Sequence, residues 1–96
     1  MNALDALADP TRRRIVELLA EDERSAGDIA AQFATSRPGV SRHLRVLHDA
    51  GLVRVREEGR RRLYSLDPAP LAELNAWLEN RLDALDTEIR RRRRKR

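Results

Sequence analysis

The sequence predicts a mainly α-helical fold with one small β-hairpin, and three observations support this prediction. Apolar residues recur at helical spacing over residues 37–50 and again over the last third of the chain. Between these regions, from Val53 onward, the pattern changes to the apolar–polar alternation of a half-buried strand. Asn, Asp or Ser, the residues that cap helices best, precede the helical stretches. We therefore expect about five helices and a two-stranded hairpin.

Two helices are expected in the first quarter of the chain. Asn2 is a good N-cap for a short helix over residues 3–8. Asp9 and the proline that follows it favour a second helix over residues 10–22, because Pro is well tolerated at the first helical position. The first turn of this helix carries three arginines, residues 12–14, against the helix dipole. This conflict indicates either an external anion or an exposed face.

Two further helices, joined by a tight turn, are predicted over residues 26–33 and 37–50. A capping-box pattern begins at Ser25, with an Asp in place of the usual Glu. Ser36 can cap the second helix of the pair, and Gly51 ends it.

A β-hairpin and a long helix complete the chain. Residues 52–56 and 61–66 are the expected strands, and the Gly-containing segment 57–60 is the expected turn. The final helix begins after residues 67–68, Asp-Pro, and its apolar positions recur every three or four residues, close to a heptad pattern. These positions form a leucine seam: Leu71, Leu74, Leu78, Leu82, Leu85 and Ile89.

A helix pair followed by a hairpin is the element order of a winged helix-turn-helix. In that fold the second helix of the pair enters the DNA major groove, which at about 12 Å is wide enough for a helix. Helical spacing turns Val40, Leu44 and Leu47 toward the core, and the other faces toward solvent. Arginine can read guanine with two hydrogen bonds, and a helix N-terminus suits a phosphate. The DNA-contact candidates on this helix are Ser36, Arg37, Pro38, Gly39, Ser41, Arg42, His43 and Arg45.

The hairpin, or wing, adds a second set of basic residues. Its DNA-contact candidates are Arg56, Arg60, Arg61 and Arg62, which we expect to cluster at its tip and to lie along the phosphate backbone. Glu57 and Glu58 oppose this charge. The alternative for all of these arginines is a solvated surface without a ligand.

The leucine seam is longer than a small winged helix can cover, so it predicts a homodimer interface that Leu4 and Leu7 join. A two-fold dimer would place its DNA-reading helices about 34 Å apart and require a near-palindromic site. In the alternative, the seam packs only on its own domain. Trp77 belongs either to the core or to that interface.

Charge is segregated along the chain. The net charge of residues 1–36 is −3, of residues 37–62 +5, of residues 63–89 −5 and of residues 90–96 +7. A basic block inside a folded region indicates an anion-binding surface, for which nucleic acid is the leading candidate. We expect residues 1–89 to form one DNA-binding and dimerisation domain and residues 90–96 to be a disordered basic tail.

Several classes of site and location are disfavoured. The chain has no cysteine, which excludes disulfides and thiolate metal sites, and shows neither a signal-peptide pattern nor an apolar run of about 20 residues. A cytoplasmic protein without membrane contact is expected. His43 and His48 lack metal-ligand spacing, and Asp83 and Asp86 are expected to be solvated carboxylates. We find no pattern for catalysis, a cofactor or a metal.

Three stretches resemble the ArsR-type (ArsR/SmtB-like) bacterial regulators, and the similarity spans roughly residues 3–80. They are residues 7–15 (LADPTRRRI), residues 41–47 (SRHLRVL) followed by residues 50–53 (AGLV), and residues 58–64 (EGRRRLY). The resemblance implies a homodimer formed by the first and last helices, operator binding through helix 37–50 and the wing, and repression that a signal relieves. It also implies a bacterial protein on the nucleoid.

Many members of that family sense metals through cysteines near the DNA-reading helix pair, where residues 32–36 of this chain read QFATS. Others use His and carboxylates on the last helix, which here carries no His. The chain therefore resembles the branch that does not sense metals, and its inducer is unknown.

Two other functions remain open. The acidic stretch 63–89 is compatible with a protein-interaction or dimerisation adaptor on the same scaffold. The tail 90–96 is compatible with general nucleic-acid binding.

Overall fold

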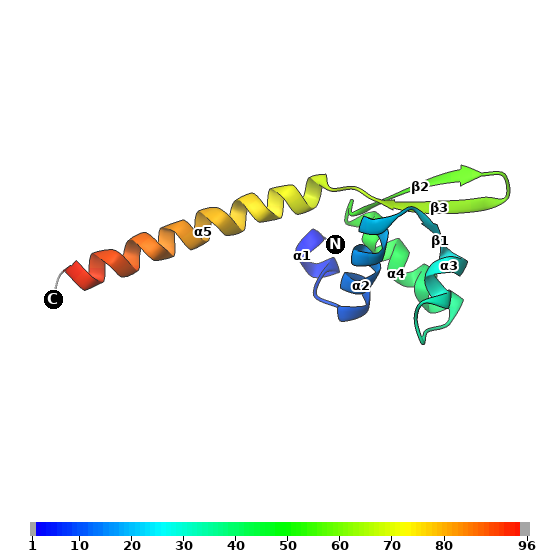
Figure 1. Ribbon diagram of the computed structural model, residues 1–96, viewed down its shortest axis with the longest axis horizontal. Helices are drawn as coiled ribbons and strands as arrows, with labels where there is room; N and C mark the ends of the chain where they lie inside the picture. Colours follow the sequence, from blue (N-terminus) through cyan, green and yellow to red (C-terminus); the bar gives the residue numbers. More distant parts are fainter. Residues whose placement is uncertain (1, 95–96) are drawn as a thin grey trace.

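A computed structural model describes residues 2–94 and contains, within them, five helices and one three-stranded sheet (Figure 1). This confirms the mainly helical class with a hairpin. The elements are α1 (Ala3–Ala6), α2 (Pro10–Glu21), β1 (Arg24–Ser25), α3 (Ala26–Ala31), α4 (Arg37–Asp49), β2 (Val53–Glu58), β3 (Arg61–Leu66) and α5 (Ala69–Arg94).

The helix starts lie where the capping residues predict them. The side chains of Asn2, Asp9, Ser25 and Ser36 each accept a hydrogen bond from the backbone N–H three residues further on. The Asp28 carboxylate in turn accepts a hydrogen bond from the backbone N–H of Ser25, which completes a capping box. Each cap satisfies a backbone N–H that has no partner within its own helix, and this fixes where α1 to α4 begin.

Two of the three arginines in the first turn of α2 donate hydrogen bonds inside the protein. The Nε of Arg12 donates to the carbonyl oxygen of Ala6 at 2.6 Å. Arg13 donates to the carbonyl oxygens of Leu7 at 2.8 Å and Ala8 at 3.1 Å. Carbonyls at the end of a helix carry partial negative charge, so the end of α1 offsets the unfavourable position of these arginines on α2. No external anion is required.

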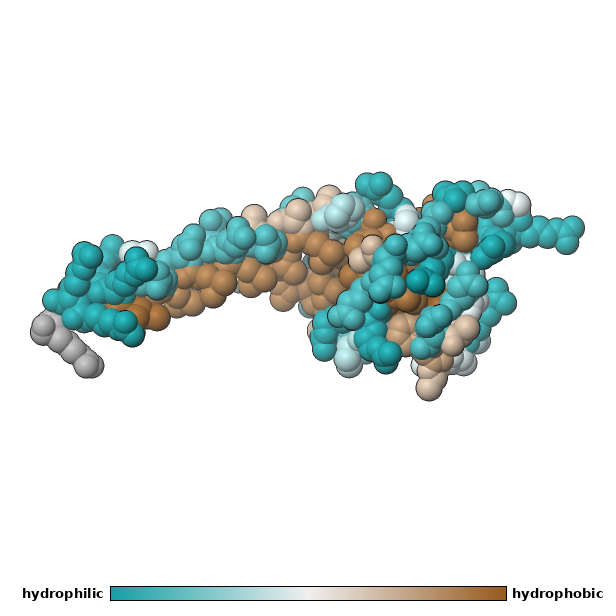
Figure 2. Space-filling model, viewed as in Figure 1, coloured by the Kyte–Doolittle hydropathy of each residue, from teal (hydrophilic) through white to brown (hydrophobic). Residues whose placement is uncertain are grey.

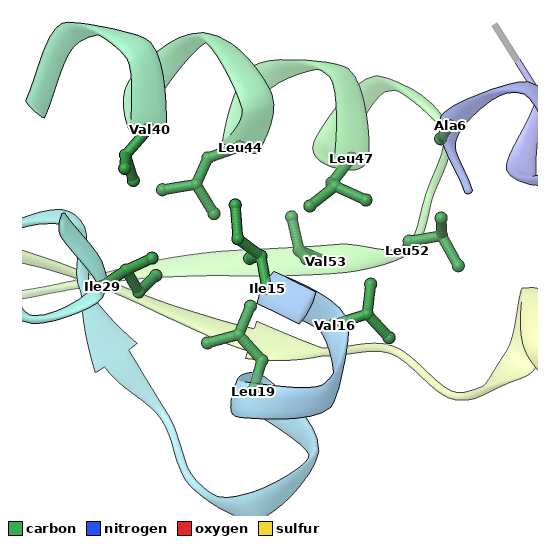
Figure 3. Close-up of a cluster of buried hydrophobic side chains, with 10 residues drawn as sticks. All are labelled: Ala6, Ile15, Val16, Leu19, Ile29, Val40, Leu44, Leu47, Leu52 and Val53. Atoms are coloured by element: carbon green, nitrogen blue, oxygen red, sulfur yellow. The ribbon is translucent and has the colours of Figure 1, made fainter. Parts of the chain in front are cut away.

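The core lies between α2, α3, α4 and the base of the hairpin. Val40, Leu44 and Leu47 of α4 are fully or almost fully buried, as predicted, and point toward Ile15 of α2 (Figure 3). The other buried members of the cluster are Ala6, Val16, Leu19, Ile29, Leu52 and Val53. This packing holds one face of α4 inward and leaves the opposite face free.

The sheet has one strand more than the sequence predicts. The strand order is β1-β3-β2, all antiparallel, and β1 is only two residues long, too short to show a periodic pattern. The turn prediction over residues 57–60 is wrong, because Glu57 and Glu58 lie in β2. The actual turn is Gly59-Arg60, and Gly59 has a φ of 62°, as the first position of a type II′ turn requires.

Helix α5 extends away from the rest of the molecule (Figure 1). With this helix included, the molecule measures 66 × 24 × 23 Å. Helix α5 runs to Arg94, so residues 90–94 are helical where we expected a disordered tail; residues 95–96 lie outside the described residues. A continuous apolar stripe follows one side of the helix (Figure 2). Trp77 is 52% exposed, so it does not belong to the core. None of the helices described is both long and apolar enough to cross a membrane.

Candidate nucleic-acid interface

Helix α4 presents a polar face to solvent. Arg37, Ser41, Arg42 and Arg45 are all exposed, whereas Val40, Leu44 and Leu47 of the same helix are buried. Within residues 2–94 none of these three arginines has a carboxylate within salt-bridge distance, although such pairs are common elsewhere in the chain. Their guanidinium groups therefore remain available to an external anion.

The start of α4 is tightly built. The Ser36 hydroxyl accepts a hydrogen bond from the Gly39 backbone N–H at 3.2 Å, which leaves its own O–H free to donate. Pro38 is exposed and has no N–H. A Cβ at position 39 would lie 3.3 Å from both the Ser36 hydroxyl and the Thr35 methyl group. A glycine at position 39 thus keeps the cap intact and allows close approach to the backbone.

A groove separates α4 from the wing and joins two sets of predicted residues. It consists of two adjoining clefts of about 390 and 260 Å³ that share Ser41, Arg62 and Tyr64. Basic or polar side chains from α4 and from the wing line it: Arg37, Ser41, Arg45, His48, Arg60, Arg61 and Arg62. The fold thus brings Arg37 and Arg45 of α4 together with three of the four wing arginines on one surface, which we call the α4 groove; Arg42 and Arg56 do not line it.

The wing arginines do not all lie at the tip. Directly opposed residues of an antiparallel pair share a face of the sheet, and neighbours along a strand alternate. Arg56 opposes Leu63 in the middle of the hairpin, whereas Arg62 opposes Glu57 on the other face. Only Arg60 lies in the turn itself. The expected cluster at the tip is therefore wrong for Arg56.

Arg56 is bound to a carboxylate from outside the wing. Its Nε and one terminal nitrogen donate to the two carboxylate oxygens of Glu23 at 2.9 and 2.6 Å, and the same nitrogen lies 3.0 Å from Glu58. This two-pronged pair is the strongest geometry for an arginine–carboxylate contact. The hydrogen bonds lower the pKa of Glu23 and raise that of Arg56.

Two more arginines on the same face of the wing are paired with carboxylates, each through a single nitrogen. Arg61 lies 3.0 Å from Asp28, in the first turn of α3, and Arg54 lies 3.2 Å from Asp67, just before α5. The pKa of Asp28 is lowered, chiefly by its hydrogen bonds with Ser25. The pKa of Asp67 is lowered first by the backbone N–H of the second residue after it and then by Arg54.

The two histidines differ in exposure. His43 is half-buried on α4, and His48 is exposed near the end of that helix, with its Nδ1 3.8 Å from the neighbouring Asp49. Within residues 2–94 no group of three or more His, Asp or Glu side chains is arranged to hold a metal ion.

Two features of this surface were missed in the sequence analysis. Glu23 and Asp28 were not recognised as arginine partners, because each lies 33 residues from the arginine that it binds. Tyr64, on β3, lines both parts of the α4 groove. The signal for its orientation was the two-residue spacing of Tyr64 and Leu66, which places both side chains on one face of the strand.

The predicted dimer residues divide into two groups. Leu7, Leu71 and Leu74 are half-buried within the chain's own body. Leu4 is 55% exposed, and the rest of the seam is open to solvent at 46% for Leu78, 64% for Leu82, 58% for Leu85 and 47% for Ile89. The outer part of the seam therefore does not pack on its own domain. A shallow, mainly apolar cleft of about 440 Å³ near α1 and the start of α5 adjoins it.

Comparison with known proteins agrees with this geometry. A family model described as a helix-turn-helix domain matches residues 7–56. The HTH-type transcriptional regulator Rv2034 of Mycobacterium tuberculosis is 51% identical over 77 residues, 80% of this chain and 72% of the relative. The transcriptional repressor SdpR of Bacillus subtilis is 35% identical over 88 residues, 92% of this chain and 98% of the relative.

Two solved structures have the same fold. An ArsR-like transcriptional regulator from Rhodococcus sp. RHA1 matches with a TM-score of 0.79 at 30% identity, over 90% of this chain and 81% of that one. The homodimeric winged helix-turn-helix DNA-binding domain of "a possible ArsR-family transcriptional regulator" from Mycobacterium bovis matches with a TM-score of 0.67 at 34% identity, over 82% and 73% of the two chains. The chain belongs to the ArsR family of winged helix-turn-helix transcriptional regulators.

Proposed function

We propose that this regulator is a homodimeric repressor that binds a near-palindromic site in double-stranded DNA. The observation that carries the proposal is the α4 groove, where unpaired arginines of a rigidly packed helix meet those of the wing. A helix held by three buried residues presents its outer face with little freedom, as specific base reading requires. The repressor SdpR, similar over almost its whole length, supports the direction of regulation.

The α4 residues contribute in different ways. Arg37, Arg42 and Arg45 are the proposed base or phosphate readers, since each is exposed and without an internal partner among the described residues. Ser41 lines the groove beside them. The closest approach to the DNA backbone is proposed for the residues at the start of α4, Ser36, Pro38 and Gly39, and for His43 further along the helix.

The dimer rests on the open part of the leucine seam. Four large apolar side chains between Leu78 and Ile89 lie along one side of an arm that no other part of the described chain covers (Figure 2). A contiguous exposed apolar surface of this kind marks a protein interface. A second copy is the proposed occupant, and the homodimeric Mycobacterium bovis domain supports this choice. Residues 1–89 would then carry both DNA binding and dimerisation.

Cysteine-based metal sensing is not part of the proposal, because the chain has no cysteine. We also infer that the protein is a regulator without catalytic activity and that it acts on the bacterial nucleoid. Its family membership supports both inferences.

Selection of bound fragments from genomic or random DNA with the purified chain tests this function. The expected result is an enriched inverted repeat with half-sites about one helical turn apart, bound with steep salt dependence. Equal binding of all duplexes would overturn sequence-specific repression. A stable complex with another protein, without any DNA shift, would instead indicate an adaptor.

A further inference from the structure

We propose that the wing arginines have two separate roles: Arg56 and Arg61, with Arg54, hold the wing against the body, whereas Arg60 and Arg62 contact DNA phosphates. This inference rests on the proposed DNA-binding function and divides a set of residues that the sequence treats as one. The two groups differ in their place on the hairpin and in their partners.

The register of the hairpin assigns the faces. Val53, Tyr64 and Leu66 pack against the core cluster, so their face of the hairpin points inward, toward α4. Arg62 opposes Glu57 on this face and lines the α4 groove. Arg54, Arg56 and Arg61 belong to the opposite face, which we call the tether face, because each is one position along its strand from a residue of the inward face.

Every arginine of the tether face is paired with an acid that lies outside the hairpin. The partners are Glu23 before β1, Asp28 at the start of α3 and Asp67 before α5, at 2.6, 3.0 and 3.2 Å respectively. Three different segments of the body thus bind one surface of the wing. Together with the pairing of β1 with β3, these ion pairs join the hairpin to the body at several points.

The remaining two arginines lack such partners. Within residues 2–94, Arg60 has no carboxylate within salt-bridge distance, and it lies in the turn. Arg62 has only Glu57, at 4.0 Å and with both side chains largely exposed, an ion pair that a phosphate can replace at little cost. Arg61 lines the groove as well, but its terminal nitrogen donates to Asp28 at 3.0 Å.

Arg56 has the least freedom to reach DNA. Both Glu23 oxygens and one Glu58 oxygen bind its Nε and one terminal nitrogen, so only the other terminal nitrogen is left for a phosphate unless these bonds break. Glu23 is the less exposed partner, with 27% of its side chain accessible. We therefore assign Arg56 and Glu23 as positioning residues of the wing.

The salt dependence of operator binding separates the two roles. Arg60→Gln and Arg56→Gln remove the same charge from the same hairpin. R60Q is expected to reduce the slope of log K against log salt by about 0.9 for each DNA phosphate that the variant no longer neutralises. R56Q is expected to weaken specific binding while the slope stays at the wild-type value. An equal decrease of the slope in both variants would overturn the assignment.

Exchanging the charges of Arg56 and Glu23 gives a second, independent test of whether Arg56 positions the wing or contacts DNA. Arg56→Glu alone places a carboxylate beside Glu23 and Glu58 and is expected to weaken operator binding strongly. Adding Glu23→Arg should recover most of the wild-type affinity if the pair only positions the wing. If Arg56 touches a phosphate, E23R/R56E must stay as weak as R56E. Thermal melts of each variant show that binding is measured on folded protein.

Glu23→Gln completes the test, with Glu17→Gln as its matched control. Both substitutions remove one negative charge, and Glu17 is an exposed residue of α2. If the Glu23–Arg56 pair holds the wing in place, E23Q should bind the operator more weakly than the wild type, and E17Q should not. Tighter binding for E23Q than for E17Q would overturn the proposal, since it would mean that Glu23 competes with DNA for Arg56. If the wild-type chain shows no salt-dependent binding to any selected site, the proposed function itself fails.

Discussion

The Nε of Arg12 donates a hydrogen bond to the carbonyl oxygen of Ala6, across 2.6 Å, and so joins the first turn of α2 to the end of α1. A terminal nitrogen of the same guanidinium lies 3.3 Å from the carbonyl oxygen of Asp5. Helix α1 is only four residues long, too short to be stable alone. Its position therefore depends on these hydrogen bonds and on the burial of Ala6.

Arg12→Gln is expected to destabilise the chain by about 1.5 kcal/mol, because it removes a hydrogen bond from a charged donor at a partly buried site. Denaturant unfolding followed by circular dichroism measures the change. Arg42→Gln, an exposed helical position, is the matched control, with an expected change within about 0.5 kcal/mol. Equal effects of the two substitutions would show that the bond to α1 contributes no stability.

The exposed face of α4 gives a prediction for DNA binding. Replacing Arg42 or Arg45 by Gln is expected to cost about 1–3 kcal/mol of specific binding if the side chain bonds a base in two places, and to relax the preference at one base pair. Fluorescence anisotropy with the selected operator and with single-base variants measures both effects. Arg81→Gln on α5 removes the same charge away from the groove and should leave base preference unchanged.

The open seam on α5 gives a prediction for assembly. Leu82 is 64% exposed within one chain, so Leu82→Glu should leave the fold of the monomer intact and abolish dimerisation, because it would bury a charge in an apolar interface. Sedimentation velocity measures the oligomeric state. Asn80→Glu adds the same charge on the opposite side of the helix and should remain dimeric. A dimeric L82E variant would show that the seam is not the interface.

Replacing glycine by alanine is expected to have opposite effects on stability at two positions. Gly51 ends α4 with a φ of 77°, a conformation that costs a residue with a Cβ about 1 kcal/mol or more, so Gly51→Ala should destabilise the protein. Gly27 lies within α3, and a Cβ there would approach nothing nearer than the Ser25 hydroxyl at 3.9 Å. Gly27→Ala should therefore stabilise the chain by up to about 1 kcal/mol. Thermal melts distinguish the two, and a shift in the same direction would contradict the backbone argument.

Stability is expected to fall in acid. The pKa values of Asp9, Glu23, Asp28 and Asp67 are all lowered in the folded chain, from ordinary values of 3.8 for Asp and 4.5 for Glu. The unfolded chain therefore binds protons more readily. The stability from these groups is present above the ordinary values and is lost as the pH falls through the lowered ones. Denaturant midpoints measured from pH 7 to pH 3 check this, and a flat profile would contradict it.

Local patterns in the sequence determined most of the helical framework. The starts of α1 to α4 and the buried face of α4 could be predicted because caps act over three residues and apolar positions repeat every three or four. The same reasoning identified the leucine seam from spacing alone. The sequence also predicted that arginines of α4 and of the wing share a role in DNA binding, because helix, turn and hairpin follow one another directly in the chain.

Only the tertiary structure decided which of those arginines stay free. Glu57 and Glu58 are poor strand formers, so the sequence suggested a turn where β2 continues, and this misplaced Arg56 at the tip. The binding of Arg56 to Glu23 and of Arg61 to Asp28 joins residues 33 positions apart, which no local pattern can reveal. The acceptors of Arg12 and the exposure of the outer seam likewise depend on how separate elements pack. Short-range hydrogen bonds and periodicity are encoded locally, whereas the pairing of charges across the fold exists only once the chain has brought them together.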